Sequence, residues 1–258
     1  MSHDPGQGPH PAAARISFGP VQVWPLSDTT ARTLRIELSG SQPQVQDPRS
    51  VRRWEELCRA NARLHDGPIW SVRAFDPVAG LVSVAPDRYR RYAVRPTVGV
   101  GVSMLAVRGV VTAIDQDGAR HVLTGLRSTQ TRVYGDLWEV IPGGGVPADG
   151  AGAEPPGVDL LLSHMRQEAR EEAGLEIDAG ECTLIGVCDD SYAGGFDVLV
   201  RISLRADLQE ARRQMGQRDW EHQQVRWMPV ASVREFDSRE SARISPPTRA
   251  IFRFLGWI

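Results

Sequence analysis

Three glutamates share one face of a single predicted helix. Glu168, Glu171 and Glu172 stand at positions i, i+3 and i+4, a spacing that brings side chains together on an α-helix. Like charges so placed repel one another, but a divalent cation among their oxygens would make the arrangement favourable. Hard oxygen ligands suit Mg²⁺ or Mn²⁺ better than zinc. The alternative is a solvated acidic face that Arg166 and Arg170 neutralise.

The elements around these glutamates follow a recognisable order. A short strand is predicted over residues 138–141, and Pro142-Gly143-Gly144-Gly145 ends it. A loop rich in Pro, Gly and Ala covers residues 146–157, and the helix is predicted over residues 159–173. Gly174 follows in the position that a left-handed C-cap prefers. The sequence therefore predicts a strand, a glycine turn, a loop and an acidic helix.

This order resembles the Nudix hydrolase superfamily, whose box is G-x5-E-x7-R-E-U-x-E-E-x-G-U, with U apolar. The second half of the box is matched by Glu168, Ala169, Glu171, Glu172, Gly174 and Leu175. Gln167 replaces the box arginine, Asp159 stands where the first glutamate would be, and Ala153 falls at the opening glycine. Gly144 is the glycine that looks equivalent, so the loop carries an insertion. A glutamine can still hold glutamates by hydrogen bonds, where the arginine would use an ion pair.

The chain is most similar to the Nudix branch that hydrolyses UDP-glucose and UDP-galactose. The similarity begins with Trp54-Glu55-Glu56-Leu57 and continues through Asn61, Leu64, Asp66 and Pro68. That branch also has a Gln-Glu pair in place of Arg-Glu and a long insertion after Pro-Gly-Gly. The resemblance implies Mg²⁺-dependent cleavage of a UDP-sugar, giving UMP and a sugar 1-phosphate.

Two alternatives stay open. One is a Nudix hydrolase of another nucleoside diphosphate linked to a group X, such as ADP-ribose. The other is a Nudix module that binds a nucleotide without cleaving it. The three intact glutamates favour catalysis, whereas the missing box arginine favours binding alone.

The resemblance also assigns roles to individual residues. It implies that Glu168, Glu171 and Glu172 bind Mg²⁺, or Mn²⁺, and carry catalysis, with Glu171 or Glu168 taking the proton of the attacking water. Gly144 is expected to offer a carbonyl ligand and Gly143 to contact phosphate, because a backbone without Cβ atoms can approach a ligand closely.

Candidates for substrate binding lie outside the box. Arg127 and Arg132 could clamp the diphosphate through their planar guanidinium groups, with surface salt bridges as the alternative. Tyr89, with Tyr92, could stack on a uracil ring or donate to the sugar; the alternative is that this segment forms an edge strand. Asp197 is a candidate for an additional acid, against the alternative of a turn or solvent-facing residue.

Composition limits the other functions. The 258-residue chain contains no lysine, which excludes Schiff-base enzymes, P-loop enzymes and protein kinases that depend on one. A net charge of −2 does not suggest a nucleic-acid binder, and the three cysteines show neither metal-binding spacing nor a disulfide framework. We expect a cytoplasmic protein that does not contact membranes and has a nucleotide-sugar as its small-molecule partner. A homodimer is an oligomeric state that the sequence leaves open.

The predicted fold is α+β, an α/β/α sandwich of the Nudix type around a mixed sheet with an N-terminal α/β extension. Residues 1–14 are expected to be a disordered arm, residues 15–95 the extension packed on the core, and residues 96–258 the Nudix domain. Strands are predicted at residues 14–24, 34–38, 69–75, 80–85, 97–114, 121–127, 138–141, 182–189, 196–204 and 223–230. Helices are predicted at residues 48–64, 159–173, 208–217 and from 248.

Overall fold

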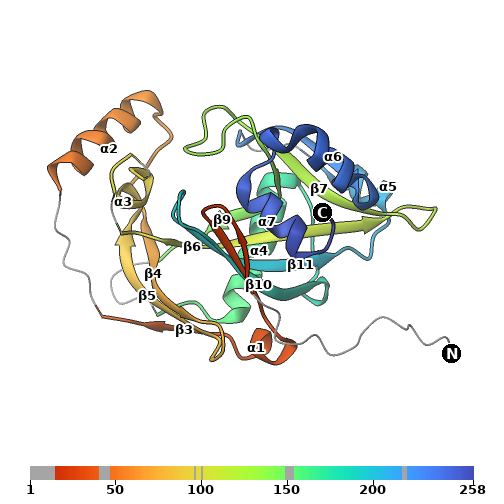
Figure 1. Cartoon of the computed structure of the whole chain (residues 1–258), viewed down its shortest axis with the longest axis horizontal. Coiled ribbons are helices and arrows are strands. Elements are labelled where there is room, and N and C mark those ends of the chain that lie inside the picture. The colour runs from red at the N-terminus through yellow and green to blue at the C-terminus, as the bar shows by residue number, and fades with distance from the viewer. Residues whose placement is uncertain (1–14, 41–46, 96, 100, 149–153, 217–219) are drawn as a thin grey trace.

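A computed structural model describes residues 15–40, 47–95, 97–99, 101–148, 154–216 and 220–258 (Figure 1). The predicted arm, residues 1–14, lies outside the described residues. Within the described ranges no helix is long and apolar enough to cross a membrane.

The described strands join in one mixed sheet. Its strands are β1 Ile16–Phe18, β2 Val21–Pro25, β3 Arg35–Leu38, β4 Pro68–Asp76, β5 Leu81–Arg88, β6 Met104–Ile114, β7 Arg120–Arg127, β8 Trp138–Val140, β9 Gly143–Gly145, β10 Cys182–Asp190, β11 Gly195–Ser203 and β12 His222–Pro229. The main path runs β1-β2-β10-β11-β6-β4-β5-β3, while β9 pairs with β6, and β7 pairs with β6, β8 and β12. The pairs β6–β11 and β3–β5 are parallel, and the other described pairs are antiparallel.

Helices cover both faces of this sheet. They are α1 Asp28–Arg32, α2 Pro48–Ala60, α3 Tyr89–Ala93, α4 Val158–Ala173, α5 Leu208–Gln214, α6 Val233–Glu240 and α7 Pro246–Phe254. In β6, Val107 and Val111 point into a core with α4, whereas Val110 points into a second core with α7. Successive strand residues face opposite sides of a sheet, so the two helices lie on opposite faces. The predicted α+β sandwich with a mixed sheet is confirmed.

The N-terminal segment extends the sheet at both ends of the main path. Strands β1 and β2 lie at the β10 end, and β3, β4 and β5 lie at the β6 end. Helices α2 and α3 lie close together at the upper left of Figure 1. The division at residues 95 and 96 stays a prediction.

Several predicted elements differ from the observed ones. The strand predicted over residues 14–24 is split, because Gly19 (φ +56°) and Pro20 form a turn between β1 and β2. The strand predicted from residue 97 begins only at Met104. The edge strand weighed for residues 87–92 is wrong beyond Arg88, because Tyr89 begins helix α3.

Other differences arise at helix ends and in the glycine turn. The last helix begins at Pro246, ahead of the predicted residue 248, because the Ser245 side chain caps it by accepting from the Thr248 backbone. The predicted helix over residues 48–64 ends at Ala60. The glycines after Pro142 form strand β9, held by backbone pairing with β6.

Candidate functional site

Helix α4 fixes the three glutamates of the motif. It buries Leu161, Met165, Ala169 and Ala173 at helical spacing against the sheet. Gly174 (φ +68°, ψ +22°) ends the helix as the predicted left-handed C-cap. This packing leaves Glu172 buried, Glu168 half-buried and Glu171 exposed.

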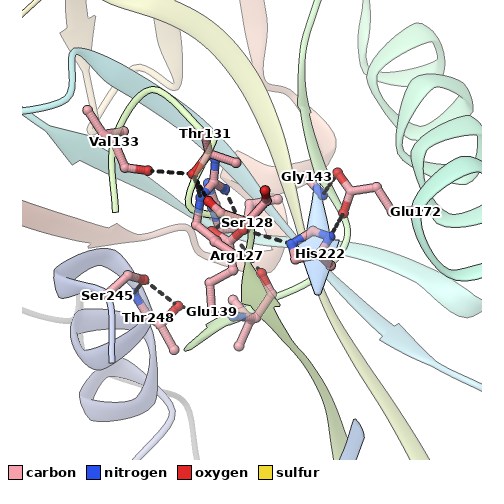
Figure 2. Close-up of polar contacts among 12 residues, drawn as sticks. Arg127, Ser128, Thr131, Val133, Glu139, Gly143, Glu172, His222, Ser245 and Thr248 are labelled. Carbon is pink, nitrogen blue, oxygen red and sulfur yellow. Dashed lines mark hydrogen bonds and ion pairs between the residues drawn. The ribbon is translucent and has the colours of Figure 1, made fainter. Parts of the chain in front are cut away.

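Glu172 lies deepest, between the glycine strand and β12. Its Oε1 accepts a 3.3 Å hydrogen bond from the Gly143 backbone N–H. Its Oε2 is buried with no hydrogen-bond partner in the described part of the chain, and His222 Nδ1 lies 3.9 Å from it. Figure 2 shows His222 between Glu172 and Glu139.

The electrostatic setting of Glu172 disfavours its charge. Burial raises the pKa of this carboxyl well above its ordinary value, and the charges of Glu221, Glu139 and Glu168 raise it further. A bound cation would stabilise the ionised form of such a carboxyl, which is buried among like charges with one oxygen unpartnered.

Glu168 lies against the glycine strand. Its Oε1 is 3.1 Å from His164 Nε2, which is also 3.0 Å from the Gly145 carbonyl oxygen. A Cβ built on Gly144 would lie 2.2 Å from Glu168 Oε1. Residue 144 therefore has to be glycine if Glu168 is to keep this position.

A residue of the same helix, Gln167, positions the Glu171 side chain. Gln167, which replaces the box arginine, donates from Nε2 to Glu171 Oε1 at 2.8 Å. The glutamine therefore holds Glu171 by a hydrogen bond, as expected, and a role of this pair in a metal site stays a prediction. Both side chains are exposed.

A buried ionic network lies next to these glutamates. Glu139 Oε2 accepts a 3.0 Å bond from Arg108 Nη1, and its Oε1 lies 3.0 Å from His222 Nε2 and also accepts from Arg127 Nη1. Arg108 Nε donates to Asp197 Oδ2 at 2.8 Å. The five side chains come from β6, β7, β8, β11 and β12, so the network links neighbouring strands of the sheet.

Opposite charges set the protonation of this network. Burial favours a neutral Glu139, but Arg127, His222 and Arg108 outweigh it and hold the pKa of this carboxyl well below its ordinary value. Burial also acts against the charge of Arg108, yet Asp197 and Glu139 raise its pKa. Burial raises the pKa of Asp197 in spite of Arg108. Glu139 is therefore ionised at neutral pH.

Replacing Glu139 by glutamine should lower the free energy of unfolding by about 2–3 kcal/mol at pH 7, because charge-assisted bonds to two arginines are weakened. A carboxyl whose pKa is lowered by folding stabilises the protein above its unfolded pKa of about 4.3. That contribution is lost as the pH falls through the folded pKa. Urea unfolding between pH 3.5 and 7 should therefore show the difference between wild type and E139Q shrinking below about pH 4.3.

Glu176 supplies the control for this measurement. It is an exposed glutamate paired with Arg170, so E176Q should unfold at the same urea concentration as wild type at each of these pH values. A constant difference between wild type and E139Q down to pH 3.5 would contradict the assignment.

The two arginines predicted to bind phosphate, Arg127 and Arg132, make hydrogen bonds to other groups of the chain. Arg127 contacts Glu139, and Arg132 donates to the Arg95 carbonyl at 2.6 Å and to the Ala193 carbonyl at 2.8 Å. The Arg132 guanidinium also lies 4.0 Å from the centre of the Tyr92 ring. A role for either arginine in holding phosphate stays a prediction.

Tyr89 and Asp197 lie at different depths around the network. The Tyr89 ring meets Trp54 edge-on and packs against Tyr92 at a tilt. Burial raises the pKa of Tyr89 to about 12, and the nearby charges of Arg132, Glu221 and Arg127 also act on it. Its predicted base or sugar contact stays a prediction. Asp197 is buried on Arg108, inside the sheet rather than in a turn or facing solvent.

Arg108, Glu139 and His222 were not predicted from the sequence. Arg108 and Glu139 are each a charged residue in a mainly apolar strand, and such residues are almost never buried without a partner; His222 begins the more polar strand β12. A charged residue within an apolar strand could therefore have indicated that Arg108 and Glu139 each belong to a buried ion pair. The sequence separation between them left the partners unknown.

The donor set around Glu172 fits a hard divalent cation. Carboxylate oxygens are what Mg²⁺ prefers, and Glu172 Oε2 has no other partner. Among the described side chains, no three of His, Cys, Asp or Glu already gather as a metal site. Glu168 and Glu171 are turned toward His164 and Gln167, so both would leave these partners to join an ion beside Glu172.

Comparison with known proteins gives neighbours among solved structures. No protein-family model and no curated protein matches the chain. A MutT/nudix family protein from Enterococcus faecalis is 15% identical over 50% of this chain and 45% of its own, with a TM-score of 0.38. A bifunctional NMN adenylyltransferase/ADP ribose pyrophosphatase from Francisella tularensis, complexed with AMP and a Mn ion, is 15% identical over 62% of this chain and 42% of its own, with a TM-score of 0.43.

A third structure is similar over most of its own length. This Nudix hydrolase from Alicyclobacillus acidocaldarius is 14% identical over 58% of this chain and 90% of its own, with a TM-score of 0.44. The chain thus spans less than half the length of the first two neighbours.

Proposed function

We propose that the chain is a Mg²⁺-dependent Nudix hydrolase that cleaves the diphosphate bond of a nucleoside diphosphate linked to another group. The observation that carries this proposal is the position of Glu172. It is a motif glutamate, buried against the glycine strand that precedes the helix, with one oxygen bonded to Gly143 and the other unpartnered. Glu168 packs on Gly144 of the same strand.

The reaction is attack of water on one phosphorus of the diphosphate. Glu168, Glu171 and Glu172 would hold Mg²⁺, which when bound neutralises the diphosphate and lowers the pKa of a bound water. Glu171 or Glu168 accepts the proton of the attacking water, and both carboxylates are accessible enough to do so. The Gly143–Gly144 backbone lies against the carboxylates of Glu172 and Glu168, where we expect Gly144 to offer a carbonyl ligand and Gly143 to contact phosphate.

We propose a UDP-sugar as the substrate, with UMP and a sugar 1-phosphate as products. The support is the similarity of residues 54–68 to the branch that acts on UDP-glucose and UDP-galactose. In the structure Trp54 of this segment contacts Tyr89, which lies within electrostatic range of Arg127 and Arg132. A cytoplasmic location and a homodimer remain predictions from the sequence.

A hydrolysis panel tests this function. Wild-type protein with Mg²⁺ is offered UDP-glucose, UDP-galactose, ADP-ribose, CDP-alcohols and dinucleoside polyphosphates, and products are separated by chromatography. We expect the highest kcat/KM with a UDP-sugar, and a fall of about 10²–10⁴-fold in E171Q. E176Q, an exposed glutamate outside the motif glutamates, is the matched control.

The panel also decides among the alternatives. Highest turnover of ADP-ribose would move the substrate to another nucleoside diphosphate. No turnover with tight nucleotide binding would support the binding module, which the replacement of the box arginine by Gln167 favours. Reaction in ¹⁸O-labelled water shows which phosphorus is attacked, because the label enters only one product.

A methyl group at residue 144 should impair catalysis with little effect on the fold. In Gly144→Ala the new Cβ would displace the Glu168 carboxylate, and misplacing a catalytic group by about 1 Å can cost about 10²-fold in rate. We expect kcat to fall about 10–100-fold, measured with the best substrate of the panel.

Gly99 provides the comparison for this variant. A Cβ added there meets no atom within 4 Å, so G99A should keep the wild-type kcat. Wild-type kcat in G144A would show that the position of Glu168 does not matter for the reaction.

A further inference from the structure

Two unpartnered atoms face each other in the buried site. Glu172 Oε2 and His222 Nδ1 are 3.9 Å apart, and neither has a hydrogen-bond partner among the residues that the structure describes. The side chains of Glu172 and His222 are 5% and 1% exposed, so bulk water does not satisfy them. Leaving two buried polar atoms without hydrogen bonds normally costs free energy, and in native proteins such atoms often lie at sites of ion binding or catalysis.

Glu139 determines which atom of the imidazole faces Glu172. Its carboxylate is kept ionised by Arg127 and Arg108, so it can only accept hydrogen bonds. His222 Nε2, 3.0 Å from Glu139 Oε1, must therefore carry a proton. A proton on Nδ1 would be a buried donor with no acceptor at hydrogen-bond distance among the described residues, so the ring fits this position as the Nε2–H tautomer and its bare Nδ1 faces Glu172.

The sheet holds the ring in this position. Strand β12 pairs with β7 through an irregular register between His222 and Gln224. On β7, Gly125 leaves the space that the ring fills: a Cβ there would lie 2.5 Å from His222 Cδ2 and 3.0 Å from Cγ. Gly125 also pairs with Glu139 on β8, so one residue places both members of the pair.

We propose that His222 is a positioning residue, fixed by Glu139 as the Nε2–H tautomer so that its bare Nδ1 leaves Glu172 Oε2 unbonded and free for a divalent cation. A donor at the position of Nδ1 would instead bind Oε2 and compete with the ion. Gly143 N–H holds the other oxygen, Oε1. The inference rests on the proposed function in assigning a cation to Glu172.

Two amide variants separate the two nitrogens of His222. In H222Q the amide of the longer side chain reaches the position of Nε2, so it can donate to Glu139 and places no donor near Glu172. In H222N the amide of the shorter side chain reaches the position of Nδ1, so it can donate to Glu172 Oε2. We expect H222Q to bind Mn²⁺ within about 3-fold of wild type and H222N to bind it about 10–100-fold more weakly, as is typical when a residue supporting a metal ligand is changed.

The measurements are Mn²⁺ titration followed by electron paramagnetic resonance, and ¹⁵N NMR of His222 in the metal-free protein. NMR should show a protonated Nε2 and a bare Nδ1. Equal Mn²⁺ affinities for H222N and H222Q would overturn the inference, and so would a proton on Nδ1. With the best substrate, H222N should recover kcat at high Mg²⁺ concentration, which a general structural defect would not do.

Gly125→Ala moves the ring without changing its chemistry. We expect G125A to weaken Mn²⁺ binding about 10-fold in the wild-type background and to add nothing in H222A, where the ring is absent. Equal losses in both backgrounds would contradict a role through His222.

Failure of the proposed function is distinguishable from failure of this inference. A wild-type protein that neither binds Mn²⁺ nor hydrolyses a substrate would contradict the function. The tautomer measured without metal still decides whether Glu139 fixes His222 as proposed.

Discussion

Replacing Glu172 by glutamine should lower kcat by about 10²–10⁴-fold while leaving the metal-free protein at least as stable as wild type. The loss of activity is expected because a neutral amide is a poor ligand for Mg²⁺. Stability should not fall, because the wild-type carboxyl is buried with an unpartnered oxygen among like charges. A glutamine can still accept from the Gly143 N–H and can donate to His222 Nδ1.

Two measurements check this expectation. Steady-state kinetics with the best substrate gives kcat, and urea unfolding in the presence of a chelator gives the free energy of unfolding. E176Q should leave both quantities unchanged. A large loss of stability in E172Q would show that Glu172 is a structural residue, and wild-type kcat would remove it from the site.

Replacing Arg108 by methionine should have the largest effect on stability. Arg108 is the shared partner of Glu139 and Asp197, and its removal leaves buried charge uncompensated. Breaking a buried ion pair in this way costs about 3–5 kcal/mol. For a domain of this size that corresponds to a fall in Tm of roughly 6–20 °C.

Calorimetry of R108M beside two further variants checks the cause. R170M removes an arginine from an exposed pair with Glu176 and should shift Tm by no more than about 2 °C. R108M/D197N should recover part of the loss, because Asp197, the carboxylate that R108M deprives of its arginine, is gone, while Glu139 keeps Arg127. A Tm for R108M equal to that of R170M would mean that the network contributes nothing to stability.

The helix that carries the motif could be predicted from the sequence because its signals are local. Apolar residues recur at helical spacing, the three glutamates share one flank, and Gly174 marks the end. Observed α4 begins at Val158, one residue before the predicted start. The mixed sheet could be predicted for the same reason, since its long strands alternate or are continuously apolar.

The buried network could not be predicted, because its bonds join strands far apart in the sequence. Nothing near Arg108 indicates that Glu139 and Asp197 meet it, and nothing near His222 indicates Glu139. Strand β9 was missed because three glycines have low strand propensity, and only pairing with β6 makes them a strand. Helix α3 was missed because its five residues are too short for a periodic signal.

The pairing of β2 with β10 has a consequence for the synthesis of the chain. Residues Val21 to Pro25 pair with Gly186 to Asp190, so β2 has no partner on that side until Gly186 has been made, 161 residues after Pro25. At about 5–20 residues per second the delay is roughly 10–30 s. Val21 and Val23, fully buried in the finished protein, also lack part of their core during this time, because helix α7 has not yet been made. During synthesis the backbone groups on that side of β2 therefore stay without their sheet partner for this time.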